Sequence, residues 1–457
     1  MKGFVYKLPF LQIRYTPYHS YNFYNFYKLK LSNLYRRFAM PSLIKLLILS
    51  ASAILVACSA EEDTIENAAS LTPELGSFGI DLSHQDQKTR PGDDFFRFTN
   101  GHWLDTYELP ADRSNYGSFS VLGDRSDARV RTIIMDLTSI EPAQDSMEQK
   151  VSDYYLSYMN TEALDKLGIS PLLPGLARLA EVDSPEELVV AFGRAGIDTT
   201  ASPFSFYIGA DRSNPDRHQL GLSIGGTGLP DRDYYLEDTE QYLNVRQEYV
   251  AHIERILNFA ELENSAAKAA AVLAVETRIA EHIWPRADRR NRDLTYNPMS
   301  FDEFLATYPD FDWNGYLSAA GIQELSDLNV SYPSAMAAII ALIAEIPVAD
   351  WNSYMTYHYI SNNANVLSDE IDKENFFFYS TILNGVPQQR ERWERGVARV
   401  GALNSLGEAV GQIYVERHFP ESAKQQMNDL VENLRGALHR ASTNSSGWGQ
   451  ILKKKLC

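Results

Sequence analysis

The stretch PGDDFFRFTNGHWLDTYELPADRSNYGSF, residues Pro91–Phe119, is the most informative part of this 457-residue chain. Its first two residues indicate a turn, and Asp93 or Asp94 can cap a helix, because carboxylates are favoured near the positive end of the helix dipole. Further along, Asn100 and Gly101 form a pair that often ends a helix in the left-handed conformation. The stretch therefore predicts a short helix that begins after the aspartates and ends near Gly101.

The predicted helix is rich in aromatic side chains: Phe95, Phe96, Phe98 and Trp103. On physical grounds alone, they predict an aromatic helix that fills a hydrophobic core. The string also resembles the N-terminal signature of the neprilysin and endothelin-converting-enzyme family of zinc metalloendopeptidases, P-x-D-D-F-[YF]-x-[YF]-x-x-G-x-W-L followed by Y-G-x-F. The matching residues are Pro91, Asp93, Asp94, Phe95, Phe96, Phe98, Gly101, Trp103, Leu104, Tyr116, Gly117 and Phe119.

Further strings resemble the same family and follow in the same order. Residues Gly228–Tyr235 read GLPDRDYY, which is similar to the family's G-L-P-x-R-D-Y-Y. Arg392 with Trp393 resembles its RW pair, and Leu406–Val415, LGEAVGQIYV, resembles its LGEALGxLYV string. The resemblance covers about residues 79–439.

Helical periodicity dominates the rest of the chain. Pro203–Gly209 and Gln219–Ile224 are strand-like on either side of a polar turn, which predicts a hairpin. We therefore expect a mainly α fold, the multi-helix N-terminal domain of a neprilysin-like peptidase with one small β-hairpin. The expected helices are Asp124–Leu137, Met147–Met159, Pro185–Arg194, Glu240–Phe259, Ser265–Trp284, Ser334–Glu345, Trp351–Ala364 and Gln388–Arg417.

The charge of the chain is strongly acidic and unevenly distributed. The formal net charge is −18, yet residues 1–57 contain eight basic residues and no acidic residue. Without that segment, 34 basic residues face 60 acidic ones, which gives −26. Because nucleic acids and anionic lipid surfaces repel such a body, we expect no nucleic-acid partner.

The basic N-terminal region resembles a processed leader. Residues 1–39 have no helical or strand period and are interpreted as a spurious or disordered leader. Residues 40–57 are expected to be a lipoprotein signal peptide, because their apolar run, Leu46–Ala57, is too short to span a bilayer comfortably. The acidic and polar residues 58–78 are expected to form a tether.

Cys58 is the expected site of lipid attachment, since the sequence LVAC that ends there resembles a bacterial lipobox. A small residue before the cysteine allows cleavage once a diacylglycerol thioether has formed on its sulfur, and each buried methylene then contributes about 0.8 kcal/mol of anchoring. Ser59 is not the aspartate associated with inner-membrane retention. We therefore expect a lipid-anchored protein of the bacterial cell envelope, at the outer membrane and facing the periplasm or the exterior. The alternative is a buried apolar segment with an incidental cysteine.

The resemblance also implies a zinc site, which needs two histidines four residues apart with a glutamate beside the first. No two of the nine histidines have that spacing, and the family's Asn-Ala-[Tyr/Phe]-Tyr strand is missing as well. The two cysteines, Cys58 and Cys457, form no CxxC pair. We therefore expect no catalytic residue, no metal ligand and no cofactor in this chain, although intact family members bind zinc.

Other charged clusters have structural interpretations. His252 and His282 each lie on a predicted helix without a second histidine, so we expect surface or hydrogen-bonded histidines and no ligands. Asp231 and Asp233 flank an arginine, which favours a self-neutralised turn over a metal site. Arg286–Arg292, RADRRNR, could hold an anion, but in so acidic a protein we expect it to pair with neighbouring acids.

The resemblance assigns residues 79–114 to packing against a catalytic domain, and residues 115–439 to the helical lid domain over a peptidase chamber. At the edge of that domain, Asn115, Tyr116, Ser120 and Gly123 are the candidate lining of the substrate cleft. Some family members carry arginines that flank Tyr-Gly-x-Phe and reach the cleft. Asn115 and Gly123 occupy those positions here, so the family's peptide preference is not carried over.

The end of the chain departs from the family. Residues 440–457 are expected to be an aberrant tail, because another reading frame permits the family's continuation there, and we hypothesise a frameshift near Arg440. The expected function is the N-terminal domain of a zinc metalloendopeptidase that acts on peptides, inactive in this chain alone. The alternatives are a non-catalytic surface lipoprotein that binds peptide or glycan, and a remnant without function. The sequence does not predict the oligomeric state.

Overall fold

The computed structural model describes residues 81–444, and the chain divides into two compact units, residues 1–108 and 109–457. The predicted leader, signal peptide and tether, with Cys58, lie outside the described residues, as does the tail from residue 445 onward. The domain boundaries expected at residues 114 and 439 stay predictions.

The described part of the first unit consists of a 3-10 turn, Leu82–His84, and helix α3, Phe95–Thr106. The Asp94 side chain caps α3 by accepting a hydrogen bond from the Arg97 amide at 2.8 Å, as the sequence predicted. The predicted end of this helix near Gly101 is wrong, because α3 continues to Thr106.

Gly101 serves a different purpose from the one that its sequence context suggested. A Cβ atom at this position would lie 2.5 Å from the Cβ atom of Asp86, so only glycine allows the preceding loop to approach the helix. The aromatic residues of α3 also differ from the expected core: Phe95 and Phe96 are 66% and 65% exposed. Trp103 stacks on Tyr107, with 4.6 Å between ring centroids.

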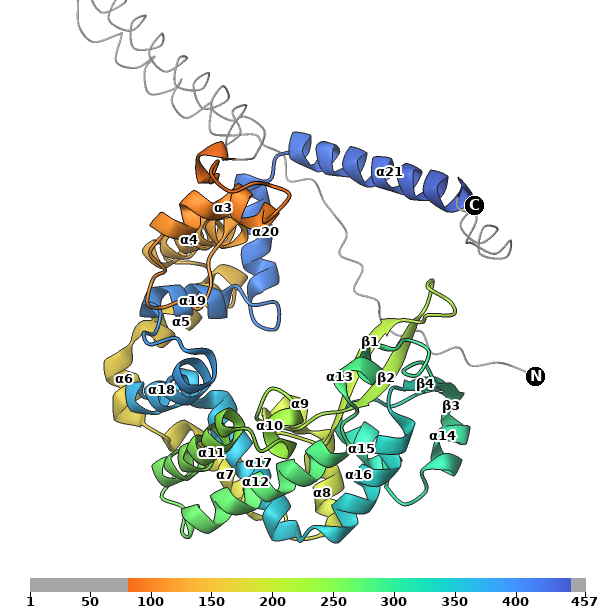
Figure 1. The fold of residues 1–457 in the computed structure, drawn as a ribbon. Coiled ribbons are helices and arrows are strands. Elements are labelled where there is room, and N and C mark those ends of the chain that lie inside the picture. Colours follow the sequence, from red (N-terminus) through yellow and green to blue (C-terminus); the bar gives the residue numbers. More distant parts are fainter. Residues whose placement is uncertain (1–80, 445–457) are drawn as a thin grey trace, which may run out of the picture. The chain divides into compact units, whose positions relative to one another are not determined.

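The second unit is mainly helical, as predicted (Figure 1). A π-helix, Phe377–Ile382, continues directly from α18. The 3-10 turns of this unit are Ser170–Leu172 and Ala364–Val366. Its α-helices are α4 (Ser118–Ser139), α5 (Met147–Met159), α6 (Thr161–Leu167), α7 (Leu173–Ala180), α8 (Pro185–Gly193), α9 (Ala195–Asp198), α10 (Asp233–Leu236), α11 (Glu240–Phe259), α12 (Ser265–His282), α13 (Arg286–Arg290), α14 (Phe301–Thr307), α15 (Trp313–Ala319), α16 (Pro333–Glu345), α17 (Val348–Asn363), α18 (Asp369–Phe376), α19 (Arg392–Val400), α20 (Gly407–His418) and α21 (Glu421–Asn444).

One expected helix, Gln388–Arg417, is two helices in the structure. α19 ends at Val400 and α20 begins at Gly407, with a tight turn between them. The Gly407 amide donates to the Ala402 carbonyl at 3.0 Å, and a Cβ atom on Gly407 would lie 2.4 Å from the Gly401 carbonyl oxygen. The LGEAVGQIYV string therefore begins at a turn that requires glycine.

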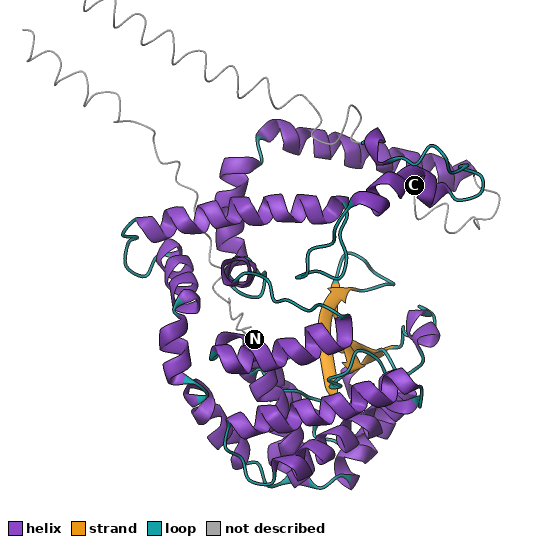
Figure 2. Cartoon of the chain, turned by 60° about the vertical axis from the view of Figure 1, so that its left-hand side comes forward, coloured by secondary structure: helices purple, strands orange, loops and turns teal. Residues whose placement is uncertain are grey.

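The sheet contains the predicted hairpin and two further short strands, shown in orange in Figure 2. Strands β1 (Phe204–Ala210) and β2 (His218–Ile224) are antiparallel, with Phe204 opposite Ile224. β4 (Asp327–Val330) pairs in parallel with β2, and β3 (Pro298–Ser300) pairs antiparallel with β4, so the strand order is β1-β2-β4-β3.

Three hydrophobic clusters stabilise the second unit. The first joins the sheet to α8, α12 and α14–α17, around Trp313 and Trp351. The second joins α10–α12 to α17 and α18, around Tyr249 and Phe378. The third holds α4, α5, α19 and α20 together through residues such as Ile133 and Val397. This last cluster positions the site described next.

Among residues 81–444, none of the individual helices has both the length and the apolar character of a membrane span. Within this described range, one pair of helices, Pro333–Glu345 with Val348–Val366, bent by 110°, meets the requirements of length and composition together.

Candidate functional site

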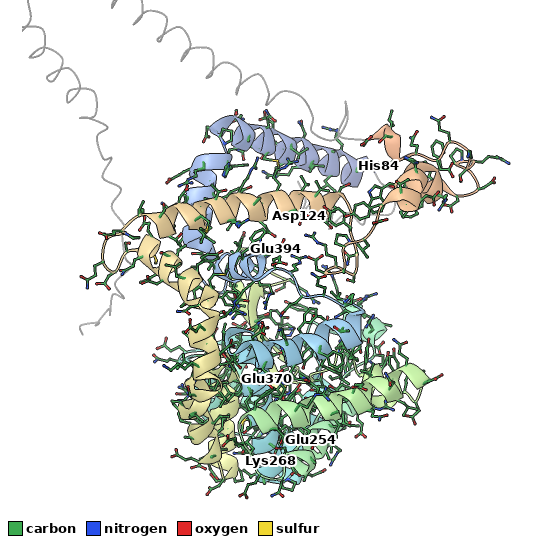
Figure 3. All side chains as sticks on the ribbon, turned by 90° about the vertical axis from the view of Figure 1, so that its left-hand side faces the viewer. His84, Asp124, Glu254, Lys268, Glu370 and Glu394 are labelled. Atoms are coloured by element: carbon green, nitrogen blue, oxygen red, sulfur yellow. The ribbon has the colours of Figure 1, made fainter. Side chains whose placement is uncertain are left out.

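Three of the four predicted cleft residues line one hollow of about 250 Å³: Asn115, Ser120 and Gly123. They come from the loop that precedes α4 and from the first turns of α4. The opposite wall is a loop distant in sequence, which contributes Val386 and Arg390 just before α19. α4 and α19 are packed together through the third hydrophobic cluster, and Figure 3 shows Asp124 on α4 and Glu394 on α19.

Tyr116, the fourth predicted residue, does not line this hollow and instead supports one of its walls. Its hydroxyl donates a hydrogen bond to Asp124 Oδ2 at 2.9 Å. Arg113 Nη2 lies 2.8 Å from Asp124 Oδ1, and the Arg113 guanidinium lies 5.2 Å from the centroid of the Tyr116 ring. Burial opposes ionisation of Asp124, but the hydrogen bonds from Arg113 and Tyr116 lower the pKa of this carboxyl overall.

Two charged side chains in the hollow remain without a partner among the residues that the structure describes. Asp127 and Arg390 make no side-chain hydrogen bond and no ion pair within the described residues. Burial raises the pKa of Asp127, while the positive charge of Arg390 acts in the opposite direction. The hollow therefore presents an acceptor and a donor of opposite charge to any molecule that enters it.

A second polar cluster surrounds Glu276 of α12 and is shielded from solvent. Glu276 is 0% exposed and accepts four hydrogen bonds or close polar contacts through its two carboxylate oxygens. Its partners are the Gly228 amide at 3.1 Å, the Tyr235 hydroxyl at 2.6 Å, the Tyr249 hydroxyl at 3.0 Å and His358 Nε2 at 2.7 Å.

The GLPDRDYY string supplies two of these partners. Gly228 must be glycine, because a Cβ atom there would lie 1.8 Å from the Tyr249 hydroxyl oxygen. Burial, and then the charge of Glu276, raise the pKa of Tyr235 and of Tyr249 far above the usual value, so both phenols stay protonated as donors. The string therefore has a structural role in this unit.

The pairing expected for the basic segment is confirmed. Arg286 Nη2 and Arg289 Nη2 lie 2.7 and 2.8 Å from Asp231 Oδ2. Arg286 and Arg289 therefore neutralise Asp231. The sequence had predicted that the neighbouring Arg232 would do so, and that partner is wrong. His252 is buried, and its Nδ1 atom lies 2.9 Å from Glu374 Oε1.

The residues that the structure describes do not fit a zinc site. Within 81–444 there is no group of three or more His, Cys, Asp or Glu side chains that could hold a metal ion. A catalytic zinc needs three protein ligands, so no step through zinc is derived from this part of the chain.

Comparison with known proteins places this architecture in a family. Residues 91–445 match the sequence pattern of the N-terminal part of peptidase family M13. The chain belongs to peptidase family M13. It is 24% identical to endothelin-converting enzyme 1 of Rattus norvegicus over 381 residues, which are 79% of this chain and 48% of that protein. Neprilysin-2 of Drosophila melanogaster is 25% identical over 381 residues, 77% of this chain and 48% of that protein. This M13 chain therefore spans about half the length of these relatives.

Solved structures share the fold of this M13 chain. The zinc metalloprotease Zmp1 of Mycobacterium tuberculosis, in complex with an inhibitor, is 32% identical with a TM-score of 0.76, over 82% of this chain and 57% of that one. PEPO from Lactobacillus rhamnosis is 20% identical with a TM-score of 0.67, over 80% and 58%, and shows the shared fold.

Several polar residues of this M13 chain that the structure brings together were not predicted from the sequence. Glu276 and His358 lie on α12 and α17, 82 residues apart, and no local pattern joins them. Arg390 follows the cleft residues by more than two hundred positions. The spacing of Asp124 and Asp127, three apart on a predicted helix, was the one available signal for paired carboxylates on a single face.

Proposed function

We propose that this M13 chain forms a peptide-binding wall of a peptidase cleft and does not itself hydrolyse peptides. The observation that carries the proposal is the hollow beside α4, in which Asn115, Ser120 and Gly123 lie together with Asp127 and Arg390, whose side chains have no partner in the part of the chain that the structure describes.

The chemistry of the hollow suits a peptide backbone. A peptide offers amide N–H donors and carbonyl acceptors, and the Asn115 amide can bind both. The Asp127 carboxylate is an acceptor for peptide N–H groups or for a cationic side chain, whereas the Arg390 guanidinium is a donor to peptide carbonyls. Zmp1 is described as a zinc metalloprotease, and by analogy we propose that relatives of this chain act on peptides.

Blocking the hollow tests this proposal. Gly123 lies in α4 with no atom within 4 Å of an added Cβ, so Gly123→Tyr should fill the hollow without disturbing the core. Gly411→Tyr is the matched control, since Gly411 is also helical, has the same free space and does not line the hollow. We expect Gly123→Tyr to weaken the binding of fluorescein-labelled peptides at least about tenfold and Gly411→Tyr to leave it unchanged. Equal binding by both variants would disprove the proposed wall.

A second measurement tests the non-catalytic part of the proposal. We expect the purified chain to bind no stoichiometric zinc and to release no product from a quenched fluorescent peptide. Stoichiometric zinc together with cleavage that a chelator abolishes would contradict it.

We also propose that the chain is lipid-anchored in a bacterial cell envelope through Cys58. The support is the LVAC sequence and the short apolar run before it. Labelling with radioactive palmitate in a Gram-negative host should mark the protein, and Cys58→Ser should abolish the label. Cys457→Ser is the control and should retain it. Labelling of Cys58→Ser at the level of the unaltered chain would overturn the anchor.

A further inference from the structure

Strand β1 forms one edge of the sheet, and its outer side is unprotected (Figure 1). Among the described residues, no strand lies beyond β1 in the order β1-β2-β4-β3. Natural proteins usually protect an edge strand with charged residues, a proline or a bulge. β1 has none of these, because it pairs with β2 in an unbroken register from Phe204 to Ala210 and residues 199–210 carry no charge. The opposite edge is protected, since β3 has only three residues and begins with Pro298, which lacks an amide hydrogen.

Two hydrogen bonds at the ends of the hairpin determine which backbone groups of β1 point outward. The Asp211 amide donates to the Arg217 carbonyl at 3.0 Å, and the Gly225 amide donates to the Pro203 carbonyl at 3.1 Å. In an antiparallel ladder, hydrogen-bonded pairs alternate with pairs that are not hydrogen-bonded, so the odd-numbered residues of β1 bond to β2. The N–H and C=O groups of the even-numbered residues therefore point away from β2.

Three of these even-numbered residues have free backbone groups. Phe204 does not, because its amide and its carbonyl each form a hydrogen bond with a side-chain hydroxyl. The outward N–H and C=O groups of Phe206, Ile208 and Ala210 have no partner within residues 81–444. The edge therefore offers alternating donors and acceptors along residues 206–210.

Apolar side chains lie beside the free backbone groups on one face of the sheet. Phe206 and Ile208 are 39% and 71% exposed, and we call this pair the apolar ledge. They lie opposite Leu222 and Leu220 of β2, which are buried in the first hydrophobic cluster. Because opposed residues of an antiparallel pair lie on the same face, the layer that covers this face of β2 does not extend over β1. The ledge therefore continues the apolar surface of the core to the edge of the sheet.

The other face of the edge is open. Tyr207 turns toward β2 on that face, since a Cβ atom on Gly221 would lie 2.2 Å from Tyr207 Cζ. Its neighbours on the same face, Ser205 and Gly209, are small. A strand added beside β1 would therefore meet the apolar ledge on one face and free space on the other.

An extended peptide matches these features better than a second copy of this chain does. A peptide strand presents its backbone hydrogen-bonding groups and its side chains with a period of two residues, as the free edge does. A stable interface between two folded proteins uses roughly 20–30 residues a side, whereas the free edge comprises only residues 206–210. The formal net charge of −18 also repels a second copy and attracts a basic peptide.

We propose that the outer edge of β1 binds an extended peptide by strand addition. The peptide backbone pairs with Phe206, Ile208 and Ala210, apolar side chains at every second position pack on the apolar ledge, and basic residues lie between them. None of the residues that line the hollow beside α4 belongs to β1. The inference therefore goes beyond the proposed wall and adds a second, separate peptide-binding surface.

The experiment measures the binding of labelled peptides to the full chain by fluorescence anisotropy. The probe is Val-Lys-Val-Lys-Val with fluorescein at its N-terminus and an amidated C-terminus. Its valines should face the ledge, so the valine N–H groups should bond to β1 while the lysine N–H groups point away. We expect N-methylation of the central valine to weaken binding at least about tenfold, and N-methylation of one lysine to change it less than about twofold. Glutamates in place of the lysines should also weaken binding, and less so as salt is added.

Variants assign the binding to this edge. Phe206→Ala with Ile208→Ala removes the apolar ledge and should weaken binding at least about tenfold, because the valines lose their apolar contacts. Ile197→Ala is the matched control, since Ile197 is also an exposed apolar residue but lies in α9. Ile208→Pro removes one outward N–H without removing a bond to β2, and it should weaken binding too. A thermal melt of each variant verifies that it is folded.

The outcomes distinguish this inference from the proposed function. Equal effects of the two N-methylated peptides, unchanged binding to the double alanine variant, or no binding at all would overturn the inference. A dimer of the unaltered chain in sedimentation velocity that the double variant dissociates would overturn it as well, and would assign the edge to a second copy. Binding that Gly123→Tyr abolishes and the edge variants leave unchanged would support the wall beside α4 and exclude the surface on β1.

Discussion

Glu276 and Asp127 are both carboxylates on long helices of the same unit, yet their surroundings are opposite. Glu276 is fully buried and each of its oxygens is bound by donors from other elements. Asp127 lines an open hollow and has no hydrogen-bond or ion-pair partner among residues 81–444. Two groups of the same chemistry thus have different roles: Glu276 stabilises the fold, and Asp127 is available to a ligand. Replacing Glu276 should therefore change the stability of the fold, whereas replacing Asp127 should change ligand binding.

The largest expected effect is the loss of the buried carboxylate. Glu276→Leu would leave two phenols, an imidazole and the Gly228 amide buried without an acceptor. We expect a loss of about 3–5 kcal/mol in the free energy of unfolding, as for one-sided removal from a buried charged network. Urea denaturation monitored by circular dichroism measures it.

Glu281→Leu provides the control for that change. Glu281 lies on the same helix, its side chain is 49% exposed, and its only ion pair within residues 81–444 is a 4.0 Å contact with Arg278. Its replacement should alter the free energy of unfolding by no more than about 0.5 kcal/mol. Equal losses in the two variants would mean that the Glu276 cluster is not structural.

A smaller effect is expected for the carboxylate that supports the hollow. Asp124→Ala removes the nearer ion-pair partner of Arg113 and the acceptor of the Tyr116 hydroxyl, and the Arg113 side chain is only 12% exposed. We expect a loss of about 1–3 kcal/mol, because the largely buried Arg113 then keeps only the more distant carboxylate of Asp112, at 3.9 Å, as a counter-charge. Thermal and urea unfolding of the variant would measure the loss.

Asp136→Ala is the matched control on α4. Asp136 pairs with Arg417, but the two side chains are 54% and 39% exposed. An exposed pair contributes about 0–1 kcal/mol, so this variant should remain near the unaltered chain. A greater loss for Asp136→Ala than for Asp124→Ala would contradict the role assigned to the Arg113 pair.

The helices were predictable where local signals act. The ends of α5 and α11 agree with the sequence prediction, because each begins at a capping residue, Ser146 or Thr239, and has a regular apolar stripe. The third and fourth strands were missed, because each has only three or four residues and is defined by pairing and not by local preference.

The candidate site was predictable only in part. The resemblance located Asn115, Ser120 and Gly123, since they are adjacent in sequence to a recognised string. Arg390 reaches the same hollow through packing of α19 on α4, which no local pattern encodes. Gly101 was misinterpreted for the same reason, because its close approach to Asp86 is a tertiary contact.

His252 is intermediate between these two carboxylates. It is buried like Glu276, but its imidazole can gain a proton and change its charge. Burial lowers the pKa of His252 below its ordinary 6.5, although Glu374 acts in the opposite direction. The unfolded chain therefore binds the proton first, and stability should fall as the pH drops below 6.5. The free energy of unfolding should fall by at most about 1.4 kcal/mol per pH unit, the limit for uptake of one proton.

His252→Phe would test this pH dependence. The ring of His252 stacks on Phe378 at 4.8 Å, and a phenyl ring can keep that contact, while Glu374 retains Arg255 at 2.8 Å. The variant should lose the decline between pH 6.5 and 5.5, whereas His218→Gln, at an exposed histidine of β2, should keep it. A decline that persists undiminished in His252→Phe would assign it to other groups.

The smallest effect on stability is expected at Asp127, and it sharpens the contrast with Glu276. Because burial raises the pKa of Asp127, its ionised form opposes folding slightly at neutral pH, and Asp127→Asn removes that charge while keeping the shape. The free energy of unfolding should stay within about 0.5 kcal/mol of the unaltered value, on the side of a gain. Affinity for a peptide with a lysine side chain should fall, because the neutral amide cannot pair with a cation, and affinity for an uncharged peptide should change little. Urea unfolding and anisotropy titration on the same preparation measure both quantities. A clear loss of stability with unchanged peptide binding would place Asp127 among the structural carboxylates and remove the distinction from Glu276.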